Sequence, residues 1–359
     1  MLSEKKIIFL VPYPLSNAPS QRFRVELFLP VLQQAGLKFS IHPFLDKRTW
    51  KSLYHNGGFL LKLFGILKGF LKRWVLLFVK IPYSDYVFIH REAAPLGPPI
   101  LEWVIAKLYR KKIIYDFDDA IWIPNTSSAN HFSRWFKAPW KVKYICRWSY
   151  KIVVGNDYLS EYASQFNRNV IKIPTCVDAQ KFHDKNKEDN RERLNIGWTG
   201  SHSTLKYLDE IVPLISELQK DHDFNFIVIA DQAPSFTLKN FEFVAWKAST
   251  EVEDLSRLDI GIMPLVADPW SEGKCGFKLI QYFACNIPAI ANPVGVNKTI
   301  IEEGVNGFLC SSAEEWRTSL QILLADESLR ESMGAAGRRK VEKFFSIGSQ
   351  SQNFILLFS

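Results

Sequence analysis

Short runs of apolar, often β-branched residues alternate with helical patterns along the whole chain, and this alternation limits the possible folds more than any other feature. Six runs in the first half read as strands, at residues 7–11, 39–42, 86–90, 113–117, 152–154 and 170–173. Six runs in the second half read the same way, at residues 194–198, 226–230, 241–244, 260–264, 289–291 and 307–310. Helical patterns such as residues 205–218 lie between them, so the order of elements predicts parallel sheets joined by crossover helices.

The two sets of strands have similar lengths, and a chain of 359 residues suits two domains with a core each. The stretch 178–193 between the two sets is densely charged, which is typical of a solvated linker. We therefore expect an α/β protein in which two doubly wound domains, at residues 1–177 and 194–343, face each other across a cleft. Residues 344–359 are expected to be a C-terminal segment that could return to the first domain.

The composition excludes several classes of protein. Apolar residues at 47% and charged residues at 23% exclude a disordered chain. The five cysteines lack the spacing of a zinc site, so we interpret them as reduced thiols of a cytoplasmic protein, and the N-terminus lacks the apolar core of a secretion signal. The best candidate for a membrane-spanning helix is interrupted by five cations, which are Lys62, Lys68, Lys72, Arg73 and Lys80.

The segment 271–288, SEGKCGFKLIQYFACNIP, reads as a glycine-containing loop that opens into a helix at about Phe277. The N–H groups and the positive dipole end of such a helix form an anion site that suits a diphosphate. Lys274 and Lys278 add positive charge, and the amide of Gln281 could bond a ribose hydroxyl. An ordinary strand-to-helix connection with solvated lysines is the alternative.

Five segments carry the most specific patterns in the chain, which are IIFLVPYPLSNAPSQRFRVELFLPVLQQAGLKFSI, YDFDDAIW, IPTCVD, KCGFKLIQYFACNIPAIANPVGVN and IIEEGVNGFLC. They resemble the family-four glycosyltransferases, and the resemblance covers nearly the whole chain. It implies the GT-B fold of two facing Rossmann-like domains, a nucleotide diphosphate sugar as the donor substrate, and transfer with retention. We expect no other cofactor and no metal ion.

The common form of this family has two glutamates, separated by seven residues, that bracket the donor loop. Aligned on Gly276, this chain has Gly273 and Gln281 at those positions, so both glutamates are missing. Glu272 lies one position early and could substitute for the first glutamate, while Gln281 could keep the ribose contact of the second. Gly276 and Phe277, at the helix start, are the remaining donor contacts that the resemblance implies in this loop.

A second candidate donor contact lies at the start of the second domain, where residues 196–201, IGWTGS, form a strand and a small-residue turn. Gly200 allows a phosphate to approach the backbone, and Ser201 offers a hydroxyl. In relatives an Arg and a Lys grip the diphosphate here, and Lys206 is the one plausible match; a plain turn with a helix cap is the alternative. Trp246, at the family's base-binding position, could hold the nucleobase or could be a core residue.

The first domain should carry the catalytic groups. Asp116, Asp118 and Asp119 in YDFDDAIW follow the fourth strand, where Asp118 or Asp119 could accept the proton of the acceptor hydroxyl or simply cap a helix. We set aside the metal-binding interpretation of this D-x-D spacing because lysines and a helix dipole already supply positive charge. His90, at the end of the third strand, is a second candidate base, although a lone histidine there is more often structural.

An arginine pair opens a predicted helix after the first strand, at the position of a glycine-rich loop in related enzymes. Arg22 and Arg24, together with Ser20, could hold an anionic acceptor or the departing diphosphate through bidentate bonds. Surface arginines paired with Glu26 are the alternative.

Residues 60–80 read as a helix with its largest apolar side chains along one line and its five cations on the opposite arc. Eight basic residues and no acidic residue lie between Asp46 and Asp85, and a second acid-free stretch, 131–151, contains three tryptophans. We interpret these stretches as an anionic membrane surface contact on the cytoplasmic side. A helix that only covers the sheet is the alternative, and nucleic acid is a less favoured partner because no recognised nucleic-acid module is present.

Together these features predict a glycosyltransferase that moves a hexose-type sugar to a hydroxyl of a glycan or lipid-linked acceptor, in bacterial-type cell-surface polysaccharide synthesis. The alternatives are a nucleotide-sugar epimerase of the same fold and a catalytically inactive binding subunit.

Overall fold

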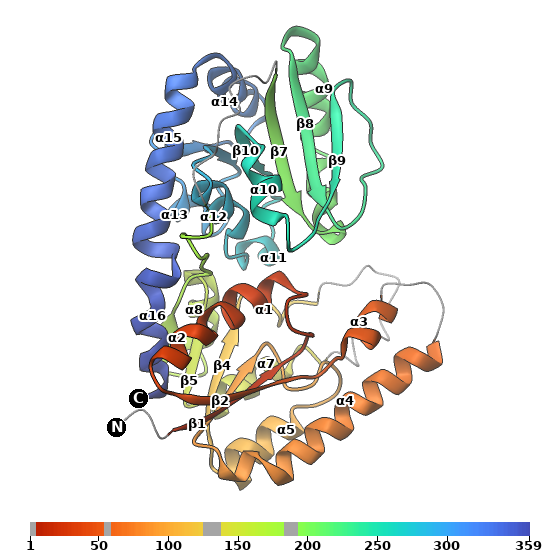
Figure 1. Cartoon of the computed structure of the whole chain (residues 1–359), viewed down its shortest axis with the longest axis vertical. Helices are drawn as coiled ribbons and strands as arrows, with labels where there is room; N and C mark the ends of the chain where they lie inside the picture. The colour runs from red at the N-terminus through yellow and green to blue at the C-terminus, as the bar shows by residue number, and fades with distance from the viewer. Residues whose placement is uncertain (1–4, 54–58, 125–137, 183–192) are drawn as a thin grey trace. The chain divides into compact units, whose positions relative to one another are not determined.

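The computed structural model describes residues 5–53, 59–124, 138–182 and 193–359. The chain divides into two compact units, Met1–Thr175 with Gln350–Ser359 and Cys176–Ser349 (Figure 1). Residues 183–192 of the predicted linker and 131–137 of the second acid-free stretch lie outside the described residues.

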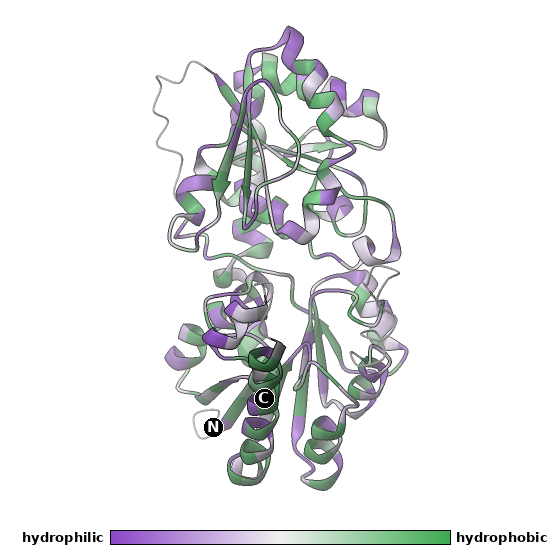
Figure 2. Ribbon diagram, turned by 90° about the vertical axis from the view of Figure 1, so that its right-hand side faces the viewer, coloured by the Kyte–Doolittle hydropathy of each residue, from purple (hydrophilic) through white to green (hydrophobic). Residues whose placement is uncertain are grey.

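Unit 1 is built on a parallel sheet of six strands in the order β2-β1-β3-β4-β5-β6. The strands are β1 (Lys6–Val11), β2 (Lys38–Pro43), β3 (Tyr86–His90), β4 (Lys112–Phe117), β5 (Lys151–Val154) and β6 (Val170–Lys172). The central strands β3 and β4 are buried along most of their length, and Figure 2 shows that much of the sheet is apolar. The strand order reverses between β1 and β3, and ligands of doubly wound sheets bind beyond the carboxyl ends at such a point.

Helices surround this sheet (Figure 1). They are α1 (Pro19–Arg24), α2 (Leu29–Gln34), α3 (Lys47–Leu53), α4 (Phe59–Val79), α5 (Ile100–Trp103), α7 (Lys141–Trp148) and α8 (Asp157–Ser164), with short turns η1 (Glu26–Phe28), η2 (Ile81–Tyr83) and η3 (Val104–Leu108).

The last residues of the chain pack into unit 1. They belong to α16 (Ile347–Ile355) and η6 (Leu356–Phe358). The ring of Phe354 stacks on Phe28 at 4.3 Å between centroids, and Lys5 Nζ donates a hydrogen bond of 2.9 Å to the carbonyl of Phe358. The C-terminus is therefore part of the core of the unit that contains the N-terminus.

Unit 2 has its own parallel sheet of six strands, in the order β12-β11-β10-β7-β8-β9. The strands are β7 (Leu194–Gly200), β8 (Phe224–Ala230), β9 (Phe241–Ala245), β10 (Ile260–Met263), β11 (Ala289–Ala291) and β12 (Gly307–Leu309). The other elements are η4 (His202–Leu208), α9 (Val212–Asp221), α10 (Glu251–Ser256), α11 (Pro269–Glu272), α12 (Phe277–Ala284), α13 (Asn297–Ile300), α14 (Ala313–Ala325), α15 (Glu327–Lys340) and η5 (Val341–Phe345). This order is that of the Rossmann fold, with its reversal between β7 and β10.

The twelve predicted strands are confirmed, and with them the α/β architecture of two doubly wound units. The single helix predicted over residues 205–218 is wrong: it is divided into η4 and α9. Pro213 explains the break, because it lies in the first turn of α9 and a proline ring prevents a helix from continuing through the residues before it. The first unit's main segment ends at Thr175 and unit 2 ends at Ser349, whereas the prediction ended the two domains at residues 177 and 343. Val177 pairs with Ser346 inside unit 2.

The long helix α4 packs with part of its cationic arc against the rest of unit 1, whereas the sequence suggested that this arc faces outward. Arg73 is buried, and its guanidinium donates to the backbone carbonyls of Ala93, His42 and Val11 at 2.7, 2.7 and 2.9 Å. Lys68 pairs with Asp46 at 2.9 Å. The predicted cationic arc is thus partly the packed side of the helix, because a long arginine side chain can satisfy buried carbonyls that no apolar side chain could.

The apolar line of α4 is exposed instead. Leu60, Phe64 and Leu71 are 78%, 68% and 65% exposed, and Leu67 and Phe78 are exposed as well. Glycines on the packed side let the helix approach closely: a Cβ at Gly65 would lie 2.3 Å from Thr49, and one at Gly69 would lie 2.6 Å from Phe44. No described helix is long and apolar enough to cross a membrane.

Candidate functional site

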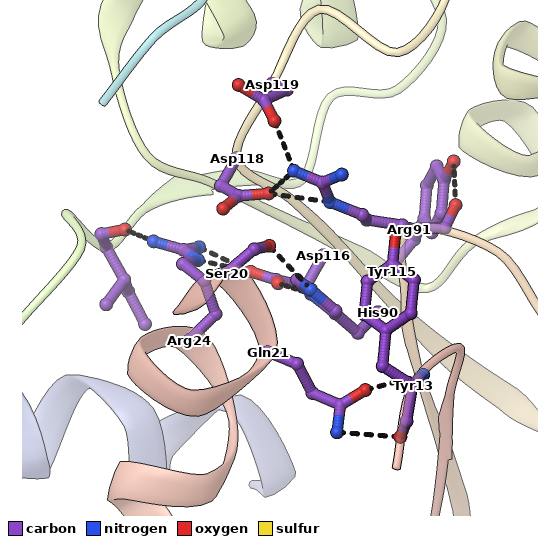
Figure 3. A network of polar contacts seen from close by, with 11 residues as sticks. Tyr13, Ser20, Gln21, Arg24, His90, Arg91, Tyr115, Asp116, Asp118 and Asp119 are labelled. Carbon is purple, nitrogen blue, oxygen red and sulfur yellow. Dashed lines mark hydrogen bonds and ion pairs between the residues drawn. The ribbon is translucent and has the colours of Figure 1, made fainter. Parts of the chain in front are cut away.

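A buried hydrogen-bonded chain lies at the carboxyl ends of β3 and β4 in unit 1 (Figure 3). Ser20 Oγ lies 2.9 Å from His90 Nε2, and His90 Nδ1 lies 2.7 Å from Asp116 Oδ2. Arg24 donates through Nε to Asp116 Oδ1 at 3.1 Å and through its terminal nitrogens to the same oxygen and to the carbonyl of Ile173. The predicted role of Arg24 in holding an anion is therefore wrong, since its charge is used inside the core. His90 and Asp116 are also fully buried, which favours a structural role for both.

Asp118 and Asp119 share one cation, Arg91, which the sequence interpretation missed (Figure 3). Arg91 Nε donates to Asp118 Oδ1 at 3.0 Å, and a terminal nitrogen of the same guanidinium contacts both carboxylates. Arg91 has a φ of 60°, and its carbonyl accepts a bond of 2.8 Å from the hydroxyl of Tyr115. A left-handed backbone in an arginine is uncommon, so the contacts around it must hold the residue in place.

The electrostatics of Asp118 reflect this arrangement. Burial alone would raise the pKa of its carboxyl, but the charge of Arg91, together with smaller effects of His90, Ser20 and Arg24, holds that pKa well below its usual range. A carboxylate with so low a pKa is a weak base. Asp119, whose side chain is 23% exposed against 11% for Asp118, is the more accessible of the two.

Arg22 is the other predicted catalytic group of unit 1. It is half-buried, and its guanidinium lies 4.8 Å from the ring centroid of Phe23 in α1. The predicted alternative, in which Glu26 pairs with the arginines, does not describe Glu26: its carboxylate accepts from Gln21 Nε2 at 2.8 Å and from the backbone of Ser16 at 2.9 Å. These bonds fix the loop that precedes α1.

In unit 2 the predicted donor loop begins with α11 and ends at the start of α12. Gly276 is the N-cap of α12 and has a φ of 64°. A Cβ at this position would lie 2.2 Å from Ile300, so only glycine fits here. Phe277 follows it as the first residue of the helix and is half-buried, as is Glu272 at the end of α11. The predicted start of the helix at Phe277 is confirmed.

The predicted lysines gather around two aromatic rings. Lys206 and Lys274 lie over the ring of Tyr207, at 5.3 and 5.8 Å from its centroid, and Lys278 lies 5.3 Å from the ring of Trp198. The structure thus brings together lysines from η4, from the loop after α11 and from the first turn of α12. This edge of the sheet carries concentrated positive charge beside the positive end of a helix dipole, which suits a diphosphate.

The turn after β7 has tight geometry. A Cβ at Gly200 would lie 2.3 Å from Trp198, so this position also requires glycine. Ser201 caps η4 through a capping box with Thr204, whose hydroxyl accepts from the Ser201 N–H at 3.2 Å. The cap that was the alternative interpretation of Ser201 is therefore present.

A buried carboxylate, Glu251, joins two of the predicted donor-binding residues. Its Oε1 accepts from Trp246 Nε1 at 3.2 Å and from Gln281 Nε2 at 3.3 Å. Gln281 is only 3% exposed and Glu251 only 6%. The sequence offered no signal for Glu251, because its partners lie 5 and 30 residues away in the chain.

In the described parts of the chain no group of three or more His, Cys, Asp and Glu side chains is placed to hold a metal ion. The five cysteines are free thiols and all are buried.

Residues 193–326 match the family model described as glycosyl transferases group 1. Unit 2 contains a glycosyltransferase group 1 domain. No curated protein sequence matches the chain. Solved structures that resemble the glycosyltransferase include sucrose-phosphate synthase from Thermosynechococcus elongatus, with a TM-score of 0.73 and 15% identity over 99% of this chain and 98% of that one.

Two further similar structures support the same fold. A glycosyltransferase from Rickettsia africae has a TM-score of 0.70 and 15% identity over 99% of this chain and 97% of that one. The Anabaena protein HepE, in complex with UDP and glucose, has a TM-score of 0.67 and 13% identity over 99% of each chain. The glycosyltransferase therefore has the GT-B fold, and the predictions of fold class and of transferase activity are confirmed.

Proposed function

We propose that the glycosyltransferase moves a hexose-type sugar, with retention, from a nucleotide diphosphate sugar to a hydroxyl of a glycan or lipid-linked acceptor in bacterial-type cell-surface polysaccharide synthesis. The observation that carries the proposal is that the group 1 match, residues 193–326, contains all three clustered lysines and the N-terminus of α12. HepE, with the same fold, is recorded with UDP and glucose and with UDP-glucose, which supports a nucleotide-sugar donor here. The match to a transferase domain favours transfer over the epimerase and inactive-subunit alternatives.

The lysine cluster supplies the chemistry on the donor side. When the bond between sugar and diphosphate breaks, negative charge develops on the departing diphosphate. Lys206, Lys274 and Lys278, with the amides at the start of α12, would stabilise that charge, and preorganised groups of this kind contribute several kcal/mol to catalysis. No metal ion is needed in this scheme.

Unit 1 would serve the acceptor. Asp119 can accept a hydrogen bond from the acceptor hydroxyl and orient it, with Asp118 held as an anion by Arg91. Arg22, close to this edge on α1, remains a candidate partner for an anionic group of a substrate. Because Asp118 is a weak base, we assign it the role of fixing Arg91 rather than that of removing a proton.

The proposal also places the enzyme at the cytoplasmic face of a membrane as a peripheral protein. The exposed apolar line of α4 lies in a stretch without acidic residues, and Lys72 and Lys80 of the same stretch are exposed as well. Apolar side chains that enter the headgroup layer beside cations bind anionic lipid surfaces. We expect Leu67→Glu with Leu71→Glu to release the protein from anionic vesicles in a sedimentation assay; equal binding of variant and wild type would contradict the membrane contact.

The activity is tested by incubating the purified chain with a panel of nucleotide sugars and measuring nucleotide diphosphate release with and without candidate acceptors. We expect release that depends on the acceptor, and a product whose anomeric configuration, read by NMR, matches that of the donor. Epimerised donor without release, or no release with any donor, would overturn the proposal. An inverted product would overturn retention alone.

A further inference from the structure

An apolar cleft of about 370 Å³ opens in unit 1 between α4 and the segment that leads from β3 into α5. Its lining includes Phe70, Trp74, Ala94, Leu96, Ile100 and Leu101. All of these side chains are apolar, and the remaining lining residues are Gly97 and Pro98. A concave site with so little polar lining selects hydrocarbon rather than sugar or nucleotide.

Polar bonds behind the lining hold the cleft in shape. The carbonyl of Ala93 accepts from Arg73 at 2.7 Å, and the N–H of Ala93 donates to Glu102 at 3.1 Å. The carbonyl of Ala94 accepts from Lys141 at 2.9 Å. Because three charged side chains take up the backbone groups of this segment, its apolar side chains are left to form the wall of the cleft.

The cleft is continuous with the exposed apolar line of α4, since the ring of Trp74, which lines the cleft, stacks on Phe78 of that line at 6.1 Å between centroids. Exposed Ile100, Trp103 and Leu108 extend the apolar surface along α5 and η3, where Lys107 and Arg110 are exposed too. Bringing two copies together through this surface would juxtapose like charges, whereas an anionic lipid complements them. Charge therefore argues for a lipid rather than a second copy of the chain.

We propose that this cleft binds one hydrocarbon chain of an anionic, lipid-linked acceptor. The inference rests on the proposed glycosyl transfer and names its acceptor class. The same segment connects the cleft to the carboxylates: Ala94 is three residues from Arg91, which spans at most about 11 Å of extended chain, and Arg91 holds Asp118 and Asp119. A lipid whose chain lies in the cleft would thus present its head group near the candidate acceptor-binding carboxylates of the same unit.

The test uses soluble n-alkyl phosphates with six, eight and ten carbons, each below its micellar concentration, with the full-length protein and calorimetric detection. We expect affinity to rise about fourfold for each added methylene, which corresponds to about 0.8 kcal/mol per buried CH₂. Ala94→Phe fills the cleft and should abolish the dependence on chain length. Ala248→Phe, the same change at an exposed residue of unit 2, should leave it intact.

A second measurement does not depend on the folding of Ala94→Phe. An alkyl phosphate with a terminal bromine should quench part of the tryptophan fluorescence of the wild type, and Trp74→Phe should remove that part, because Trp74 lines the cleft. Affinity that does not change with chain length, or quenching that survives Trp74→Phe, would overturn the proposal. Dissociation of a dimer by the probes would also overturn it, in favour of a second copy on this surface.

Failure of the proposed reaction gives a different result. Binding of a nucleotide diphosphate by the wild type, measured without acceptor, tests the donor site alone. If alkyl phosphates bind as expected but no nucleotide sugar is turned over, the transfer reaction is wrong and the hydrocarbon site stands.

Discussion

Introducing a glutamate at position 281 should destabilise unit 2. Gln281→Glu would place a second carboxylate about 3.3 Å from the buried carboxylate of Glu251. Two unit charges at that distance repel by about 5 kcal/mol at an effective dielectric constant of 20. Protonating one carboxyl with an ordinary pKa of about 4.3 costs only about 3.7 kcal/mol at pH 7, so the variant would take up a proton. We expect the free energy of unfolding to fall by roughly 3–4 kcal/mol at pH 7.

The same reasoning sets the sign of the pH dependence. In the variant, the folded state would bind a proton that the unfolded state releases, so stability falls as the pH rises above the ordinary value. At pH 5 the cost of protonation is about 1 kcal/mol, and most of the loss should disappear. Urea unfolding of the wild type and the variant at pH 5 and pH 7 measures both values.

A double change provides the control. Glu251→Gln with Gln281→Glu exchanges the amide and the carboxylate, which restores one donor and one acceptor across the pair, so it should recover most of the stability that the single variant loses. Wild-type stability of Gln281→Glu at pH 7, or a double variant no better than the single one, would refute the pairing on which the argument depends.

The remaining predictions concern catalysis and packing. Lys278→Ala should reduce turnover at least about tenfold, or roughly 1.4 kcal/mol, with an unchanged circular dichroism spectrum. Lys298→Ala, at an exposed position, should leave turnover unchanged. Equal kinetics for the two variants would contradict the role of Lys278 at the diphosphate. Saturating chelator should leave transfer unaffected, and restoration of a lost activity by Mn²⁺ or Mg²⁺ would require a metal site instead. Arg73→Met should destabilise unit 1 by about 3–5 kcal/mol, because three buried carbonyls lose their donor. The control, Lys72→Met at an exposed position, should change the free energy of unfolding by less than about 0.5 kcal/mol. Similar urea midpoints for the two variants would show that the three bonds contribute little.

The central strands could be predicted from the sequence because they are short apolar runs buried on both faces of a parallel sheet. The start of α12 could be predicted as well, since Gly276 and the helix after it are adjacent in the chain. Arg91 and Glu251 could not, because each acts through partners that only the folded chain brings near it: Arg91 lies 27 residues from Asp118, and Glu251 lies 30 from Gln281. For Arg91 a weak signal existed, as it directly follows a buried strand.

The helix α4 shows a different limit of sequence analysis. Its pattern identifies two faces, one apolar and one cationic, but the usual rule that the apolar face points inward gives the wrong orientation. Arg73 decides the orientation, since it satisfies three carbonyls of neighbouring segments, and Gly65 and Gly69 allow the close approach. A stretch of apolar surface of this extent on the outside of a protein is typical of an interaction site.

The charges of the two units imply a division of the chemistry. In unit 1 the carboxylates at the ends of the strands are paired with arginines, Asp116 with Arg24 and Asp118 with Arg91, and the low pKa of Asp118 leaves that group little capacity to remove a proton. In unit 2 the lysines lie over aromatic rings next to a helix N-terminus, where they can stabilise an anion. If the acceptor is activated only weakly, most of the lowering of the barrier must come from the departure of the diphosphate. Substitutions in the lysine cluster should therefore reduce turnover more than substitutions of Asp118. General-base catalysis by Asp118 would give the opposite order, so this comparison distinguishes the two mechanisms.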